Sequence, residues 1–121
     1  MAALIHHLAL ASDYAASPSD QPYLPPAYAA DGFIHCTQQL TVLAEVATRF
    51  YSQVSGDFLV LDIDPRRLTS ELRYEPPMPP APVGSPLHGV LFPHIYGPLN
   101  RNAIVTIRLA QRAPDGRFVQ V

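Results

Sequence analysis

The 121-residue chain has a single cysteine, no lysine and no long apolar run, and each absence narrows what the protein can be. With only Cys36, an internal disulfide is impossible, and a reducing compartment fits this composition. All basic residues are arginines, and the net charge of -2 gives no general attraction to nucleic acid or an anionic membrane. No apolar stretch approaches the length of a membrane span, and the first ten residues lack the basic start of a secretory signal. We expect a cytoplasmic protein with no nucleic-acid or membrane partner.

Motifs for common cofactors are also missing. No glycine-rich phosphate loop is present, which removes the Walker and Rossmann interpretations. No two histidines stand four residues apart, as they do on a metal-binding helix. His7, His35 and His94 lie on separate predicted strands and can still meet around zinc, so a zinc-dependent hydrolase stays open as an alternative. Cys36 points away from His35 on a strand, and we expect a buried structural cysteine rather than a nucleophile.

Length and composition predict one domain covering residues 1–121, since the apolar fraction of 48% is normal for a soluble globule. The 14 prolines are the most unusual feature of the composition. Six of them lie between residues 76 and 86. Proline lacks a backbone donor and fixes φ, so this segment predicts an extended surface loop between two strands. A ligand for a proline-binding partner is the alternative interpretation.

The hydrophobic pattern predicts an α+β fold of mostly antiparallel strands with one main amphipathic helix. Thr37 is the expected N-cap of that helix, and Gly56 and Asp57 are its expected end, because apolar residues recur every three or four positions between them. Ser12 is expected to cap a short turn, and Asp64 with Pro65 to open another. The first strand is expected to be central in its sheet. Strands are predicted at 4–10, from 33, at 58–63, 71–75, around 94–96, at 103–109, with one face of that strand buried, and at 118–121.

Two stretches set polar pairs on otherwise apolar strands. Side chains two apart on a strand share a face, so His35 points with Thr37, and His94 points with Tyr96. Buried polar groups need partners, and we therefore interpret the stretches as two walls of one pocket. Glu75 becomes part of this site only if it lies beside the histidines. The two stretches are DGFIHCT at 31–37 and FPHIYGPLN at 92–100.

The pattern resembles a bacterial family called domain of unknown function 952. The segments that carry the resemblance lie at 5–8, 32–37 with the helix after it, 59–64, 73–75 and 92–100. That family is similar, more distantly, to the ADP-ribosyltransferase superfamily, and in pattern most to RNA 2′-phosphotransferases, which use NAD. Their histidine-bearing strand before an amphipathic helix is similar to the segment from His35 to Thr37. Their early histidine is similar to His7, although the arginine that precedes it there is His6 here.

The resemblance implies a split, mostly antiparallel double sheet with an NAD cleft between its halves. It implies that His35 and Thr37 hold the nicotinamide ribose, that Tyr96 stacks on the nicotinamide and that Glu75 is the transferase carboxylate. No motif ties an arginine to phosphate binding, which speaks against RNA phosphotransfer. The expected catalytic residues are thus Glu75 and His35, and the expected cofactor-binding residues are His7, Thr37, His94, Tyr96 and Asn100.

Three functions follow as alternatives. The first is an NAD-dependent ADP-ribosyl or related transferase, or a hydrolase acting at the nicotinamide ribose; cleavage there passes through an oxocarbenium-like transition state that a carboxylate can stabilise. The second is a non-catalytic module that binds a small ligand in the same pocket. The third is the zinc-dependent hydrolase. All three have a small-molecule ligand.

Overall fold

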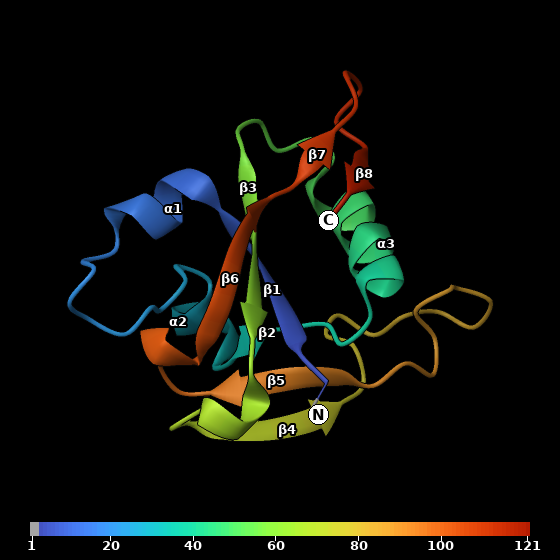
Figure 1. The fold of residues 1–121 in the computed structure, drawn as a ribbon. Coiled ribbons are helices and arrows are strands. Elements are labelled where there is room, and N and C mark those ends of the chain that lie inside the picture. The colour runs from blue at the N-terminus through green and yellow to red at the C-terminus, as the bar shows by residue number, and fades with distance from the viewer. Residues whose placement is uncertain (1–2) are drawn as a thin grey trace.

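The protein is described by a computed structural model that covers residues 3–121. The predicted α+β class with antiparallel strands is confirmed: the described chain forms two three-stranded sheets, a hairpin and one long helix with two short ones (Figure 1). No helix in this part of the chain has the length and apolar character needed to cross a membrane. The strands are β1 (Ile5–Leu10), β2 (Ile34–His35), β3 (Phe58–Ile63), β4 (Glu71–Glu75), β5 (Phe92–Tyr96), β6 (Ile104–Leu109), β7 (Gln111–Arg112) and β8 (Phe118–Gln120); the helices are α1 (Ala11–Ala16), α2 (Tyr28–Asp31) and α3 (Leu40–Tyr51), with 3-10 turns η1 (Pro65–Arg67) and η2 (Arg101–Ala103).

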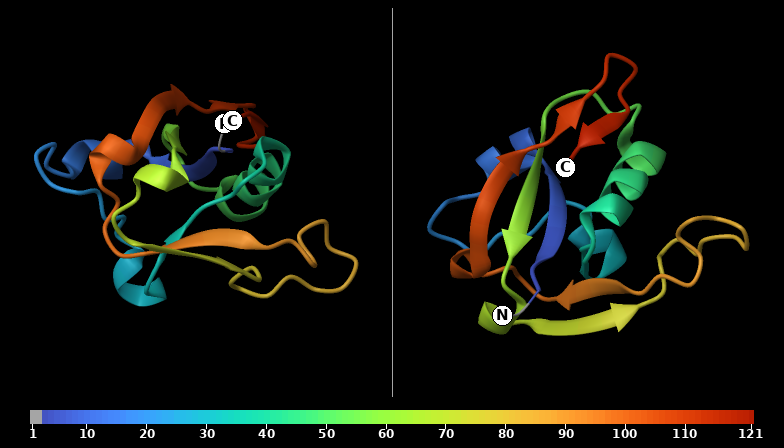
Figure 2. Two further views of the ribbon diagram at one scale, coloured as in Figure 1. Left: turned by 60° about the horizontal axis from the view of Figure 1, so that its bottom comes forward. Right: turned by 45° about the vertical axis from the view of Figure 1, so that its right-hand side comes forward.

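Two antiparallel sheets are set across one another. The first has the strand order β1-β3-β6 and the second has the order β2-β5-β4. Figures 1 and 2 show the second sheet lying across the end of the first. Backbone hydrogen bonds in both directions between His6 and Thr37, each 2.8 Å, join the two sheets beside β1. The second sheet, with its two histidine strands paired, therefore carries most of the candidate residues.

Side chains alternate between the two faces of β1 and β3, so these strands contribute to two separate cores. Ile5 and Ala9 of β1 face the same side as Leu61 of β3 and pack with the second sheet, in a cluster that also contains Ile34 and Ile95. The opposite face of the first sheet packs against α3 and the C-terminal hairpin. Its core residues are Leu43, Ala47, Phe58, Val60, Ala110 and Phe118.

Helix α3 is the predicted amphipathic helix, but it is shorter than its periodicity indicates. Thr37 is not its N-cap, because the Thr37 backbone is paired with β1; Gln39 occupies the cap position without a side-chain hydrogen bond. The helix ends at Tyr51, before Gly56. Along the predicted apolar face only Leu43 and Ala47 are buried. The C-terminal half of that face is left free to line a cavity.

Three other local predictions are wrong, for identifiable reasons. β1 lies at an edge of its sheet, with β3 in the centre. Ser12 lies inside α1 and makes no cap. On β6 the apolar face is not buried: Ile107 and Leu109 are 49% and 60% exposed, because β6 is an edge strand and no described element covers its end. The turn after Asp64 forms as predicted, with Asp64 accepting from the Arg66 N–H.

Candidate functional site

The pairing of β2 with β5 brings the two predicted histidine stretches together. His35 lies directly opposite His94 in the antiparallel register, and directly opposite residues present their side chains on the same face. The two imidazole rings meet edge to face, with 5.5 Å between centroids. Phe33 packs against both rings, stacking on His94 at 4.0 Å. The two stretches therefore form neighbouring walls, as the alternation along the strands predicts.

Glu75 lies beside this pair, at the end of β4. Its Oε1 accepts hydrogen bonds from the Tyr96 hydroxyl (2.5 Å) and from His94 Nδ1 (2.8 Å). These two donors lower the pKa of Glu75, so the carboxylate stays ionised. Burial lowers the pKa of His94 despite the carboxylate, so its ring is neutral, with the proton on Nδ1. His94 and Tyr96 thus share a face and a common acceptor. Glu75 lies beside the histidines, which was the condition for including it in the site.

His35 also has a carboxylate partner, Asp31, which was not among the predicted site residues. Its Nε2 donates to Asp31 Oδ2 at 2.8 Å, four residues back along the chain at the end of α2. The pair is partly exposed, with 41% of the His35 side chain accessible. Hydrogen bonding to a carboxylate fixes the tautomer of each imidazole and leaves its second nitrogen as an acceptor. The site therefore holds two carboxylate–histidine pairs side by side, Asp31 with His35 and Glu75 with His94.

His7 approaches the same region from β1. Its Nδ1 donates to the His35 backbone carbonyl at 2.6 Å. His7 is only 6% exposed, and burial lowers its pKa to about 4. Its Nε2 is buried and has no hydrogen-bond partner. An unsatisfied buried acceptor costs free energy, so this nitrogen is available for a donor group of a ligand or a water molecule.

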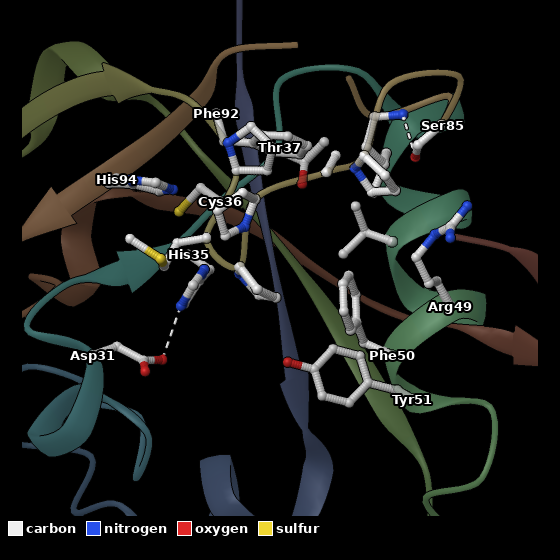
Figure 3. Close-up of a pocket in the computed structure, with 18 residues that line it drawn as sticks. Asp31, His35, Cys36, Thr37, Arg49, Phe50, Tyr51, Ser85, Phe92 and His94 are labelled. Carbon is white, nitrogen blue, oxygen red and sulfur yellow. Dashed lines mark hydrogen bonds and ion pairs between the residues drawn. The ribbon is translucent and has the colours of Figure 1, made fainter. Parts of the chain in front are cut away.

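Three adjoining cavities surround these side chains. The first, of about 710 Å³, lies between β2, α3 and the proline-rich loop and is floored by His35, Thr37 and His94 (Figure 3). The second, of about 290 Å³, is lined by His7 and His35 together with Tyr23 and Tyr28. The third, of about 560 Å³, is lined by Glu75, His94 and Tyr96 under the proline-rich loop. His35 borders the first two and His94 borders the first and third.

Several residues at the site were not found from the sequence. Arg49 and Tyr51 line the first cavity from α3, opposite the histidines (Figure 3). Arg49 lies off the apolar face of α3 and is exposed, so the helical period gives no sign that it borders a cavity. The proline-rich segment is a loop between two strands, as predicted, but residues 83–89 form turns instead of continuing in an extended conformation. The loop also lines two cavities. Asp31 and Phe33 were detectable, since both lie next to His35 in the motif.

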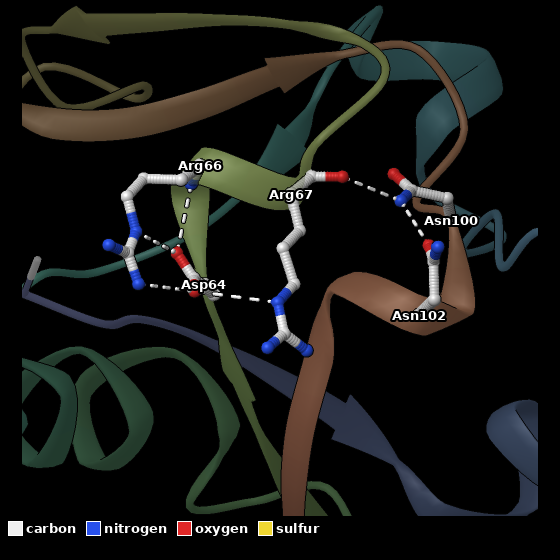
Figure 4. Close-up of polar contacts among 5 residues, drawn as sticks. All are labelled: Asp64, Arg66, Arg67, Asn100 and Asn102. Carbon is white, nitrogen blue, oxygen red and sulfur yellow. Dashed lines mark hydrogen bonds and ion pairs between the residues drawn. The ribbon is translucent and has the colours of Figure 1, made fainter.

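Asn100 is the predicted site residue that lies apart. Its Oδ1 accepts from Thr69, and its amide donates to the Arg67 carbonyl and to Asn102 (Figure 4). It lines none of the three cavities described above. These bonds fasten the turn after β3 to the turn before β6, beside the Asp64–Arg66 cap.

Cysteine and metal chemistry receive no support from the described residues. Cys36 is buried in the first core, and burial raises the pKa of its thiol, which disfavours the nucleophilic thiolate. Within residues 3–121, no group of three His, Cys, Asp or Glu side chains is placed to hold a metal ion. His7 and His94 each use Nδ1 within the protein. The zinc alternative therefore has no geometric basis in this part of the chain.

A further histidine–carboxylate cluster lies on the opposite face of β1. Asp62 accepts two hydrogen bonds on each oxygen, from His6, from the Thr106 hydroxyl and twice from the Arg108 guanidinium. Burial alone would raise the pKa of Asp62, but these donors outweigh it and lower the pKa to about 2. All lone pairs of this carboxylate are in use, so the cluster is structural.

Comparisons with known proteins give a family and a fold. A family described as "Protein of unknown function (DUF952)" matches residues 8–107. Two crystal structures of protein CC0527 from Caulobacter crescentus, one of them a double mutant, align over 95% of this chain and 92% of theirs. Both give a TM-score of 0.68, with 20% identity for the mutant and 21% for the other. At that identity the likeness shows the fold alone. Among curated proteins no match is found.

Proposed function

The chain belongs to the DUF952 family of proteins of unknown function, and from that premise we propose that it binds NAD or a related nucleotide and transfers or hydrolyses at the nicotinamide ribose. The observation that carries the proposal is the pair of carboxylate–histidine dyads at the junction of the cavities. The resemblance to ADP-ribosyltransferases is our reason for assigning these dyads to chemistry at the nicotinamide ribose.

The residues present fit the nicotinamide and ribose portion of such a nucleotide. Ribose hydroxyls and the carboxamide are hydrogen-bond donors, and the cavities offer acceptors: the bare Nε2 of His7, the second nitrogens of His35 and His94, and Thr37. Aromatic rings at Phe33 and Tyr96 suit a planar heterocycle. For the diphosphate, Arg49 is the one arginine among residues 3–121 that lines these cavities.

Each side chain has a role that follows from its setting. When bound, NAD supplies an N-glycosidic bond whose cleavage builds positive charge on the ribose. Glu75, held ionised by Tyr96 and His94, presents a fixed negative charge to that region. His35, oriented by Asp31, can accept a proton from a hydroxyl or water nucleophile. His7, Thr37, His94 and Tyr96 are assigned to holding the nucleotide. Asn100 is assigned to the scaffold.

The alternative is a binding module without catalysis. It is favoured by the open position of the Asp31–His35 pair, because exposure to solvent weakens a charge or a base relative to an enclosed site. Such a module would bind the nucleotide in the same cavities and release no nicotinamide.

Two measurements on one sample separate these functions. We expect millimolar NAD to raise the melting temperature through ligand linkage, and nicotinamide to be released over hours in a chromatographic assay. Glu75→Gln should keep the melting shift and lose the release. Glu71→Gln makes the same charge change four residues away, in an exposed ion pair with Arg73, and should keep both. A shift without release identifies the binding module. The absence of any shift in folded protein contradicts nucleotide binding.

A further inference from the structure

The third cavity has a chemical character unlike that of the first. Its volume is about 560 Å³, and its lining is made of aromatic, proline and methionine side chains with a single carboxylate. The aromatic members are Phe33 and Tyr96, with the imidazoles of His88 and His94. No arginine lines it among the described residues. Apolar walls weaken solvent screening, so one charge at such a surface acts strongly on a ligand.

The carboxylate is Glu75, and half of its hydrogen-bonding capacity is unused. Tyr96 and His94 both donate to Oε1. Oε2 accepts no hydrogen bond from residues 3–121, and 32% of the side chain is accessible. A carboxylate oxygen can accept two bonds. The protein therefore fixes the group in place through one oxygen and leaves the other open.

Neighbouring charges do not cancel that of Glu75. Arg73 is paired with Glu71 through two hydrogen bonds of 2.7 and 3.1 Å, so these two side chains neutralise each other. His94 is neutral because burial lowers its pKa. The same Arg73 lies over the Tyr96 ring, with its guanidinium carbon 4.4 Å from the centroid. A guanidinium packed on this aromatic ring and paired with a carboxylate is thus an arrangement that the chain already contains.

We infer that the third cavity binds an organic cation, an ammonium or a guanidinium carried on an apolar stem. The cation would bond Glu75 Oε2, while the stem would pack among Phe33, Met78 and the prolines of the loop. Charge-assisted hydrogen bonds and cation–π attraction both favour such a ligand over a neutral one of the same shape. The site shares Glu75 with the proposed function but does not rest on nucleotide binding.

The test uses wild-type protein without nucleotide and three small probes. Benzylamine and phenylguanidine carry the cation, and benzyl alcohol is the neutral match for benzylamine. Titrations followed by ¹H–¹⁵N NMR should give saturable shifts confined to the amides of residues 33, 75, 78, 88–89 and 94–96. The cations should bind at least about tenfold more tightly than benzyl alcohol. Their binding should also weaken as ionic strength rises.

Variants then assign the interaction to one carboxylate. Glu75→Gln should weaken cation binding by about tenfold or more and leave benzyl alcohol unaffected. Glu45→Gln removes an exposed carboxylate of α3 that lines none of the three cavities, and it should change both by less than about twofold. The inference is overturned if benzyl alcohol binds as tightly as benzylamine, or if Glu75→Gln binds the cations as tightly as the wild type. The comparison of the alcohol with the amine uses wild-type protein alone, so it does not depend on the folding of a variant. The NAD melting shift is measured separately on the same protein, so either result can fail without the other.

Discussion

Two clusters on opposite sides of β1 each pair a carboxylate with a histidine. They differ in how many hydrogen bonds the carboxylate accepts from the protein. On one side Asp62 accepts four hydrogen bonds, two on each oxygen. On the other side Glu75 accepts two bonds on one oxygen and none from the described residues on the second. His7, next to His6 in the chain, leaves its Nε2 bare. A carboxylate–histidine pair therefore indicates a ligand site only when acceptors remain open toward a cavity.

The two clusters also differ in their exposure and in whether they border a cavity. Asp62 is 5% exposed and borders none of the three cavities. The Glu75–His94 pair borders two of them. Removing a group from the first cluster should thus affect stability, and removing a group from the second should affect protonation and binding. The following predictions test that division, from the largest expected effect to the smallest.

Asp62→Asn is expected to be the most damaging change. It leaves Arg108 without its ionised partner and His6 without a charged acceptor, so the free energy of unfolding should fall by about 3–5 kcal/mol in urea denaturation. In the wild type, the low pKa of Asp62 gives a contribution that is present above about pH 4 and is lost as the pH falls toward about 2. The variant should lack that acid-dependent part. A loss no greater than that of Glu75→Gln would remove the distinction between the clusters.

The pH dependence of stability should report His7. Between about pH 6.5 and about pH 4 the unfolded chain binds a proton at this residue and the folded chain does not. The free energy of unfolding should therefore fall as the pH is lowered through this window, by about 3 kcal/mol in all. His7→Gln, which can still donate to the His35 carbonyl, should flatten the slope. His88→Gln in the exposed loop serves as the control and should leave it steep.

Asn100→Ala tests a residue placed in the site from the sequence and in the scaffold by its contacts. Loss of its hydrogen bonds to Thr69 and Arg67 should cost about 1–2 kcal/mol of unfolding free energy. NAD-dependent shifts in melting temperature should be unchanged in size. Asn102→Ala removes only one bond and is the matched control. A variant of normal stability that no longer responds to NAD would return Asn100 to the site.

Tyr96→Phe should produce the smallest effect, confined to protonation. The Tyr96 hydroxyl is the main cause of the low pKa of Glu75. Without it, the pKa of Glu75 should rise toward the ordinary value for glutamate, as seen by ¹³C NMR of the carboxyl carbon. Tyr74→Phe removes the hydroxyl of an exposed residue on β4, the strand that carries Glu75, and should leave the pKa of Glu75 unchanged. An unchanged pKa in Tyr96→Phe would show that the hydrogen bond contributes nothing.

Much of the local structure was predictable, because it depends on neighbours in the chain. The apolar run at 58–63 and the alternation along 71–75 predicted β3 and β4 at their observed bounds. The face shared by His94 and Tyr96 followed from the two-residue period of a strand. Errors arose where pairing across the fold overrode a local preference. Thr37 is a good N-cap by composition, yet its backbone is held by His6.

The site was predictable in part. Pairs of polar residues on apolar strands pointed to His35 and His94, and both border the same cavity. Arg49 was not predicted as a site residue, because helical periodicity describes one helix in isolation. It does not describe a loop that folds over the exposed side. Asn100 stands in the 92–100 segment that carries part of the resemblance, and a motif cannot show whether a side chain faces a cavity or a neighbouring turn.

The sequence by itself determined the antiparallel α+β class, the amphipathic helix and the orientation of each histidine on its own strand, because these depend on the period of the backbone. Only the tertiary structure decided which carboxylate each histidine meets and which lone pairs stay open. Those outcomes depend on the register between strands and on how the two sheets are joined, where contacts between distant residues outweigh local preference.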